Sequence, residues 1–158
     1  MESDSTRYDS IDRKILVRLQ RDASIQNQTL AAEVGLSPSP CHRRVRALQE
    51  GGVIRSYVAL LDAPSVGAGF LAFVDVRLER QSLEFSERFE KAVIARPEIL
   101  ECVRVTGDYD YLLKVVAQDI DAFHRLLIEF LARIKGVANT RTLIALNRVK
   151  ETTALPIA

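Results

Sequence analysis

The spacing of apolar and polar residues at the start of the chain predicts short helices. The first covers residues 10 to 22, with Asp9 or Ser10 as its cap, because four apolar residues recur on one helical face. These are Ile11, Ile15, Leu16 and Leu19. The second begins with Asn27 as its cap and ends at Gly35, because glycine readily adopts the left-handed conformation that terminates helices.

A third predicted helix follows after a short turn. Ser37 caps it, the prolines at 38 and 40 cost little in a first turn that has no hydrogen-bonding partners, and the pair Gly51-Gly52 ends it. Its core-facing residues are Cys41, Val45 and Leu48. Three helices with a glycine-bearing turn between the last two describe a helix-turn-helix, in winged or plain three-helix form.

The rest of the chain alternates strand and helix patterns. Residues 53 to 61 are typical of an extended segment, and the stretch to residue 69 is rich in turn residues. Apolar runs then predict strands at 70–78, 99–106, 109–117 and 137–149, with helices at 83–95 and 120–134. The order strand, helix, strand, strand, helix, strand predicts an α+β, ferredoxin-like βαββαβ domain.

We therefore expect three parts: a helix-turn-helix domain at residues 1–53, a strand-bearing linker at 54–69, and a βαββαβ domain at 70–158. In this fold both helices cover one face of the sheet, and the other face normally alternates polar residues toward water. The runs FLAFVDV, YLLKVVA and TLIAL are apolar in both registers. This favours a homodimer that buries the second face, although apolar central strands also occur in monomers.

Composition narrows the possible functions. With 47% hydrophobic and 27% charged residues, no apolar run of about 18 residues and a polar, acidic start, the chain is expected to be a cytoplasmic globular protein with no membrane partner. Two cysteines, Cys41 and Cys102, lie too far apart for a zinc motif, so no metal is expected. The familiar nucleophile, phosphate-loop and metalloprotease motifs are absent from the sequence, so no enzyme activity and no catalytic residue are predicted.

The net charge is only +1, so any nucleic-acid contact must come from a local patch. No carboxylate lies between Glu33 and Glu50, whereas three arginines do, and the third helix directs Arg43 and Arg46 away from the core while Arg44 turns back toward it. Arg43 and Arg46 are the candidates for base edges. The candidates for phosphate contacts are Asn27, Gln28, Ser37, Ser39 and His42. The alternative is an ordinary solvated face.

A second candidate site is the turn between the middle strands, Thr106-Gly107-Asp108-Tyr109-Asp110-Tyr111. Gly-Asp alone is ordinary hairpin chemistry. Two carboxylates and two tyrosines exceed what a turn needs, and paired carboxylates accept the three donors of an ammonium group. From the residues alone, a plain turn and a ligand site both stay open.

The segments LAAEVGLSPSPCHRRVRALQEGGVIRSYVALLD, VTGDYDYLLKV and TRTLIALNRVK resemble the Lrp/AsnC family of transcription regulators, over residues 9 to 150. The resemblance implies a helix-turn-helix domain that binds double-stranded DNA and a RAM or ACT-like effector domain that dimerises and assembles to an octamer. It also implies no cofactor but a free amino acid as effector, bound between dimers. The segments LSPSPCHRRVRAL and GDYDYLLK resemble the leucine-responsive branch, which makes leucine the first candidate.

The residues that the resemblance implies for the effector are Gly107, Asp108, Tyr109, Asp110, Tyr111, Ile120, Thr140, Thr142 and Ile144. Arg104 departs from what a leucine pocket would need and joins the candidates, because it could meet the effector carboxylate, pair with Glu101 or select another amino acid. Two other functions stay open: an architectural, sequence-tolerant DNA-organising protein, and a ferredoxin-like small-molecule-binding protein without a DNA role.

Overall fold

The chain forms two compact units, which we describe separately. The computed structural model describes residues 8–80 and 82–157. One unit takes the chain up to Ala59 together with Lys150–Ala158, and the other is Leu60–Val149. The last nine residues, expected in the βαββαβ domain, thus belong with the helices. None of the described helices is long and apolar enough to cross a membrane.

The helical unit contains α1 (Ser10–Arg21), α2 (Asn27–Val34) and α3 (Pro38–Glu50). Asp9 is the cap of α1, and with Asp12 it forms a capping box in which each side chain accepts a backbone N–H of the other residue. The three helices meet around a common core of Ile15, Leu16, Leu30, Ala31, Val34, Cys41 and Leu48. Within its described residues this unit has no strand, so it takes the plain three-helix form.

The ends of α2 and α3 correct part of the prediction. Gly35 terminates α2 in the left-handed conformation, with φ of 76°, as predicted. Asn27, however, is the first helical residue and not the cap, a position that Gln26 holds without a side-chain hydrogen bond. Ser37 does occupy the cap position of α3, yet its hydroxyl makes no capping hydrogen bond.

The C-terminal segment packs onto α1 within the helical unit. The Gln20 side-chain amide donates to the Leu155 carbonyl at 3.1 Å, and the Leu155 N–H donates to Gln20 Oε1 at 2.6 Å. Ile157 lies half-buried against the core of the three helices. Two hydrogen bonds and one apolar contact therefore fix this segment, whose sequence KETTALPIA predicts no element of its own.

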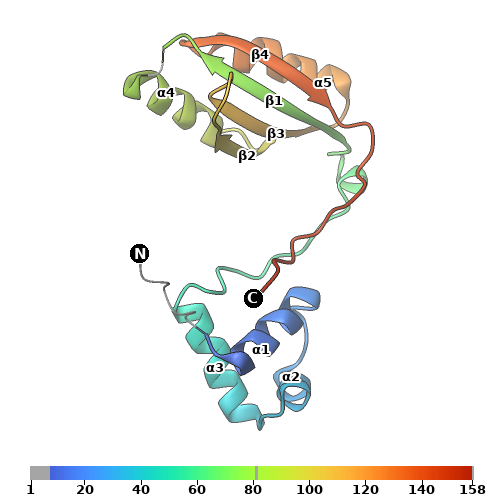
Figure 1. The fold of residues 1–158 in the computed structure, drawn as a ribbon. Helices are drawn as coiled ribbons and strands as arrows, with labels where there is room; N and C mark the ends of the chain where they lie inside the picture. The colour runs from blue at the N-terminus through green and yellow to red at the C-terminus, as the bar shows by residue number, and fades with distance from the viewer. Residues whose placement is uncertain (1–7, 81, 158) are drawn as a thin grey trace. The chain divides into compact units, whose positions relative to one another are not determined.

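The second unit is a four-stranded antiparallel sheet in the order β2-β3-β1-β4. Its elements are β1 (Phe70–Leu78), α4 (Leu83–Ile94), β2 (Ile99–Arg104), β3 (Tyr111–Ala117), α5 (Ile120–Arg125) and β4 (Val137–Ile144). Both helices lie on one face of the sheet (Figure 1). The core between them takes alternate residues of β1 and β3 with Phe89, Val93 and Phe123 of the helices, as a ferredoxin-like βαββαβ fold requires.

Several elements are shorter than predicted because apolar runs do not mark where pairing stops. β2 ends at Arg104 and β3 begins at Tyr111, so the turn between them is longer; β4 ends at Ile144. Beyond α5 the helix continues as one π-helical turn, Leu126–Phe130, and a 3-10 turn, Leu131–Arg133. Residues 54–69, all of them described, contain no strand in this single chain but one 3-10 turn, Pro64–Val66.

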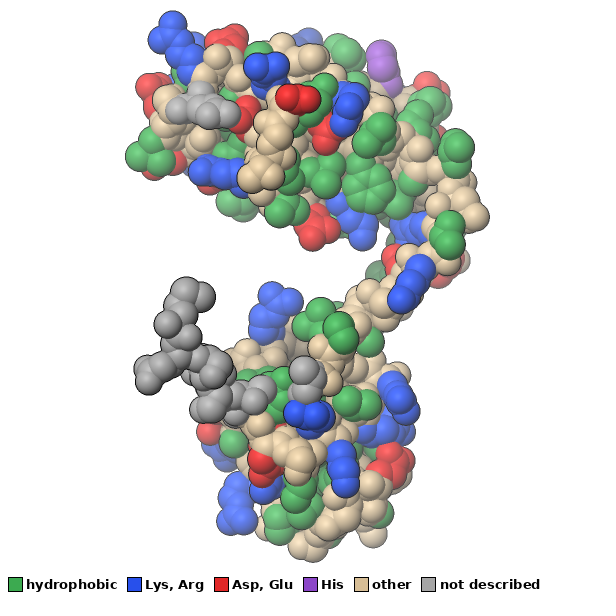
Figure 2. Space-filling model, in the orientation of Figure 1, with side chains coloured by type: hydrophobic (Ala, Val, Ile, Leu, Met, Phe, Trp, Pro, Cys, Tyr) green, Lys and Arg blue, Asp and Glu red, His purple; other side chains and the backbone are tan. Residues whose placement is uncertain are grey.

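The face of the sheet away from the helices mixes apolar residues with one ion pair. Val103 is 44% exposed and Leu143 48% exposed, with Phe73 and Leu112 half-buried beside them. Arg141 Nη2 lies 2.6 Å from Asp75 Oδ2 in the same face. Figure 2 shows apolar side chains exposed among charged ones on the visible side of this unit.

Candidate functional site

The exposed face of α3 carries two arginines with different surroundings. Arg43 is exposed and has no hydrogen bond or ion pair among the described residues. Arg46 Nε donates to Glu50 Oε1 at 2.7 Å, in a pair whose side chains are 70% and 65% exposed. A pair this exposed is weak and easily exchanged for another anion. Both guanidinium groups are therefore available to a partner, Arg43 without breaking any contact.

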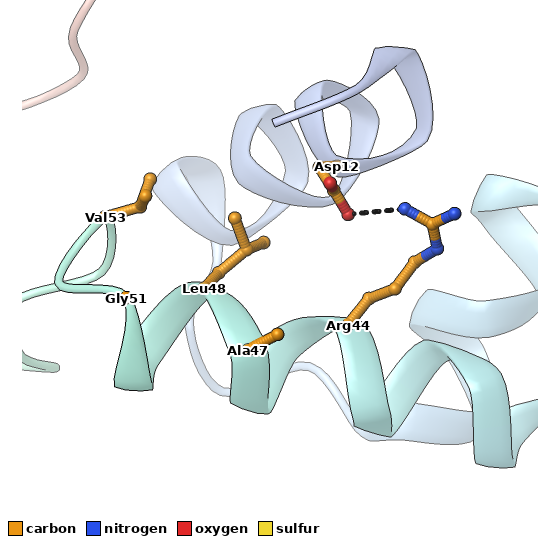
Figure 3. A pocket seen from close by; sticks show the side chains of 6 residues that line it. All are labelled: Asp12, Arg44, Ala47, Leu48, Gly51 and Val53. Atoms are coloured by element: carbon orange, nitrogen blue, oxygen red, sulfur yellow. Dashed lines mark hydrogen bonds and ion pairs between the residues drawn. The ribbon is translucent and has the colours of Figure 1, made fainter. Parts of the chain in front are cut away.

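Arg44, between them in sequence, turns toward α1. Its Nη1 donates to Asp9 Oδ2 at 2.7 Å and to Asp12 Oδ1 at 2.9 Å. These two carboxylates raise the pKa of the guanidinium, Asp12 more than Asp9. Figure 3 shows the Asp12 contact at one end of a cavity of about 390 Å³, whose other lining residues are Ala47, Leu48, Gly51 and Val53. Arg44 thus anchors α3 to the start of α1, as its direction on the predicted helix indicated.

The residues predicted to contact phosphates divide into one structural residue and four exposed ones. Asn27 Nδ2 donates to the Pro38 carbonyl at 2.8 Å and so ties the beginning of α2 to the beginning of α3. The exposed residues are Gln28, Ser37, Ser39 and His42. Ser37 and Ser39 lie at the N-terminal end of α3, where backbone N–H groups without helical partners favour an anion.

The turn between β2 and β3 is held by its second aspartate. Asp110 Oδ2 accepts the Leu78 N–H at 2.7 Å, the Asp110 N–H donates to the Val76 carbonyl at 2.9 Å, and the Val105 N–H donates to the Asp110 carbonyl at 3.0 Å. Gly107 has φ of 115°, which favours glycine. The Asp110 carboxylate therefore joins the turn to the end of β1, a structural contact that hairpin chemistry alone does not predict.

A cavity of about 350 Å³ lies beside this turn. Its apolar lining comes from Leu78, Leu83 and Val105. Its polar lining comes from Ser82, Ser86, Arg104, Asp110 and Tyr111. Three of the predicted effector residues, Arg104, Asp110 and Tyr111, are thus brought together in one chain, with one cation and one carboxylate among them.

Arg104 pairs with Glu90 of α4, not with Glu101. Its Nη2 lies 2.7 Å from Glu90 Oε1 and donates to the Tyr111 hydroxyl at 3.0 Å, and that hydroxyl donates to Glu90 Oε1 at 2.7 Å. The Tyr111 hydrogen bond, followed by Arg104, lowers the pKa of Glu90. Burial raises the pKa of Tyr111. The centroid of its ring lies 4.7 Å from that of the Phe89 ring. Arg104 is therefore oriented by a fixed carboxylate and a buried ring.

Two other residues of the turn lie near β4. The Arg141 guanidinium carbon lies 4.9 Å from the Tyr109 ring centroid. Asp75, Tyr109 and Asp108 raise the pKa of Arg141, with Asp75 the largest cause. The turn thus contacts β4 through Arg141, a residue that the sequence reasoning did not select.

The remaining predicted effector residues do not line the cavity beside the turn. In the antiparallel register Thr140 lies opposite Val76, near the turn, whereas Ile144 lies opposite Ala72, farther along β1. Ile120 follows the opposite end of β3 and is 56% exposed. A strand of this length spans about 20 Å, so one chain does not place Ile120 and Gly107 around a common small molecule.

Sequence reasoning missed five of the eight cavity-lining residues and the partner of Arg104. Ser82, Ser86 and Glu90 follow the helical spacing of one α4 face, which is the signal that could have found them. Nothing in the sequence pattern indicated which arginine that face would meet. The pairing depends on α4 crossing the sheet above β2 and β3.

Comparison with known families assigns both units. Residues 71–155 match the Lrp/AsnC ligand binding domain, and residues 8–55 match a winged helix-turn-helix DNA-binding domain. The first match alone covers more than half of the chain. The chain belongs to the Lrp/AsnC family. It is accordingly an Lrp/AsnC DNA-binding transcription regulator with a ligand-binding domain.

Relatives of this Lrp/AsnC regulator match almost its full length. The leucine-responsive regulatory protein of Klebsiella pneumoniae is 45% identical over 149 residues, 94% of this chain and 91% of that protein. A transcriptional regulator from Neisseria meningitidis, solved with L-Met, has a TM-score of 0.91 at 38% identity and covers 94% of this chain and 96% of its own. An AsnC family transcriptional regulator from Agrobacterium tumefaciens has a TM-score of 0.90 at 41% identity and covers 94% of this chain and 97% of its own.

Proposed function

We propose that this Lrp/AsnC regulator binds specific DNA sequences through α3 and changes its DNA binding in response to a free amino acid. One observation supports the DNA-binding part of this proposal: Arg43 is exposed and unpaired among the described residues, and Arg46 beside it is only weakly paired. The helix that carries them is held in place by the contacts of Arg44 and Asn27. An arginine that binds guanine O6 and N7 in a bidentate way contributes about 1 to 3 kcal/mol of discrimination.

A fluorescence-anisotropy titration with operator and random DNA at fixed salt tests this reading. Arg43→Ala and Arg46→Ala should each weaken operator binding by roughly 5- to 150-fold and reduce the preference over random DNA. Arg125→Ala, an exposed arginine of α5, is the matched control and should bind normally. Full affinity with unchanged preference in either α3 variant would remove that residue from base recognition.

A homodimer is the proposed DNA-binding unit. The exposed Val103 and Leu143 on the uncovered sheet face support it, because apolar residues gathered on a sheet face favour association. Two copies of α3 about one turn of DNA apart, roughly 34 Å, would require a pseudo-palindromic site. Further assembly of dimers to an octamer is part of the proposal. Light scattering that gave a monomer mass would contradict it.

The proposed effector is a free amino acid bound where dimers meet. Three observations support this: the cavity beside the turn contains Arg104 and Asp110, Ile120 lies too far from it for a site within one chain, and the Neisseria regulator was solved with L-Met. Leucine is one candidate, because the Klebsiella relative is a leucine-responsive regulatory protein. Methionine is the other, because the Neisseria regulator was solved with it. The ligand regulates only through different affinities for two assemblies or spacings of the DNA-binding helices.

A thermal-shift panel of the twenty amino acids, followed by DNA titration with and without each hit, tests the response. One or a few amino acids should raise the unfolding midpoint and alter operator affinity. A protein that binds DNA without sequence preference and ignores all twenty would be an architectural DNA-organising protein instead. One that binds an amino acid but no DNA would be a small-molecule-binding protein.

A further inference from the structure

The cavity beside the turn between β2 and β3 is lined by charged, polar and apolar side chains, and each kind complements a different chemical group of a small molecule. Building on the proposed amino-acid response, we propose that Arg104 binds the carboxylate of the effector. The site then takes an α-amino acid with a free carboxylate and an aliphatic or thioether side chain.

Arg104 has hydrogen-bonding capacity left for a ligand. Only its Nη2 donates in the hydrogen bonds to Glu90 and Tyr111, so among the described residues Nε and Nη1 have no partner. The side chain is 62% exposed and lines the cavity. A guanidinium carries five N–H donors in one plane, and a carboxylate is the acceptor whose two oxygens match that plane.

The direction of Arg104 is fixed before any ligand arrives. Glu90 Oε1, 2.7 Å away, and the Tyr111 ring, whose centroid lies 5.5 Å from the guanidinium carbon, hold the group at the cavity wall. The Tyr111 hydrogen bond and Arg104 together lower the pKa of Glu90, so this carboxylate stays ionised at neutral pH. A side chain that is already ordered loses less conformational entropy when a ligand binds.

The other walls suit the rest of an amino acid. Leu78, Leu83 and Val105 offer apolar contact, and the Asp110 carboxylate lines the same cavity. An ammonium group is the kind of donor that a carboxylate accepts. The volume of about 350 Å³ falls in the range of small-molecule sites. A cation, an anion and an apolar wall around one space complement a zwitterion with an apolar side chain.

The first test compares acids with amides on the full-length, unmodified protein. Titration calorimetry and thermal shift are run with leucine and methionine, and then with leucinamide and methioninamide. The amides keep the side chain and the ammonium group but lose the anionic carboxylate. We expect at least one acid to bind, and its amide to bind at least about tenfold more weakly. Equal affinity of acid and amide would overturn the proposal.

The second test removes the guanidinium. Arg104→Leu should weaken binding of the acid at least about tenfold and shrink the difference between acid and amide. Arg104→Lys, which keeps the charge without the planar pair of donors, should give an intermediate affinity. Arg88→Leu is the matched control, because Arg88 pairs with Glu84 of α4 at 2.8 Å and does not line the cavity. It should bind as the unmodified protein does.

The outcomes separate this proposal from the function on which it rests. If leucine or methionine binds the Arg104→Leu protein as tightly as the unmodified one, Arg104 is not the carboxylate group, while the amino-acid response stands. If no amino acid binds the unmodified protein, both are wrong. If Arg104→Leu fails to fold, the Arg104→Lys variant and the acid-amide comparison still decide.

Discussion

The two units build their candidate sites from residues at very different sequence distances. In the helical unit Arg43 and Arg46 lie three positions apart on α3, and one helical period places both on the solvent side. In the sheet unit the cavity combines Leu78 of β1, Ser86 of α4 and Arg104 of β2. The first arrangement follows from local periodicity alone, whereas the second exists only after the sheet has paired and α4 has packed on it.

The arginines of the two units also differ in what they contact. On the exposed face of α3, Arg43 has no partner among the described residues and Arg46 has only a largely exposed pair with Glu50. In the sheet unit, Arg104 contacts both Glu90 and Tyr111, and Arg141 lies 2.6 Å from the buried Asp75 carboxylate. A surface that binds polyanionic DNA gains from unpaired cations, because phosphates supply the missing charge. A small-molecule site gains from cations held in one direction. The difference in pairing therefore matches the difference in the proposed partners.

The largest expected effect tests how far the sheet unit depends on long-range packing. Gly136 has φ of 103°, and a Cβ there would overlap Cδ1 of Phe85 and lie 2.8 Å from its Cε1. Gly136→Ala should therefore lower the free energy of unfolding by about 2 to 4 kcal/mol, from backbone strain and from displacement of the ring. Urea unfolding followed by near-UV signals of the sheet unit measures this loss.

The control is a second glycine with positive φ, at which an added Cβ would meet no neighbouring atom. Gly67 has φ of 73° with no atom within 4 Å of an added Cβ, so Gly67→Ala should cost only about 1 to 2 kcal/mol. An equal decrease in the free energy of unfolding of the two variants would show that the Phe85 ring moves aside without an energetic cost. The core would then depend less on this long-range contact than the structure indicates.

The sequence predicted the parts that depend on local pattern. The strand at Phe70–Leu78 and the helix ending before Gly51 agree with the structure because a short apolar run, a 3.6-residue period and a terminating glycine are signals that act over a few residues. The cap of α2 was wrong by one residue. Asn27 has the side chain of a good cap, but its amide instead reaches the Pro38 carbonyl of the next helix. A tertiary contact replaced a local one.

The sequence left the non-local contacts open. Three roles for Arg104 were possible because its charge said nothing about which carboxylate the fold would bring near, and Glu90 lies 14 positions away on another element. Likewise Gln20 and Leu155 are 135 positions apart, so no periodicity connects them. The C-terminal segment departs most from the predicted division of the chain, because it follows the sheet unit in sequence and yet packs against the helices.

A medium effect tests that C-terminal contact. Gln20→Ala removes both hydrogen bonds to Leu155, each of which contributes about 0.5 to 1.5 kcal/mol, so the segment should detach at a cost of about 1 to 3 kcal/mol. Hydrogen exchange at the Leu155 amide should become fast. Leu155→Ala is the control, because the bonds use its backbone and its side chain is 73% exposed. Unchanged exchange in Gln20→Ala would contradict the contact.

The smallest expected effect is a pH dependence confined to the sheet unit. The Tyr111 hydroxyl, followed by Arg104, lowers the pKa of Glu90 below its ordinary value of 4.5. A carboxyl group whose pKa is lower in the folded state contributes stability above its unfolded pKa, and this contribution disappears as pH falls through the folded pKa. The unmodified protein should therefore be more stable than Glu90→Gln at pH 7, and the difference should shrink below about pH 4.5.

Urea unfolding of both proteins between pH 3 and pH 7 measures that difference. Its size should be small, because the pair with Arg104 is largely exposed and water screens it. Glu84→Gln, which breaks the exposed pair with Arg88, is the matched control and should show no comparable pH dependence. A Glu90→Gln difference that stayed constant down to pH 3 would mean that packing of the side chain, and not its charge, supports Tyr111 and Arg104. Arg104 would then be oriented mainly by the aromatic ring.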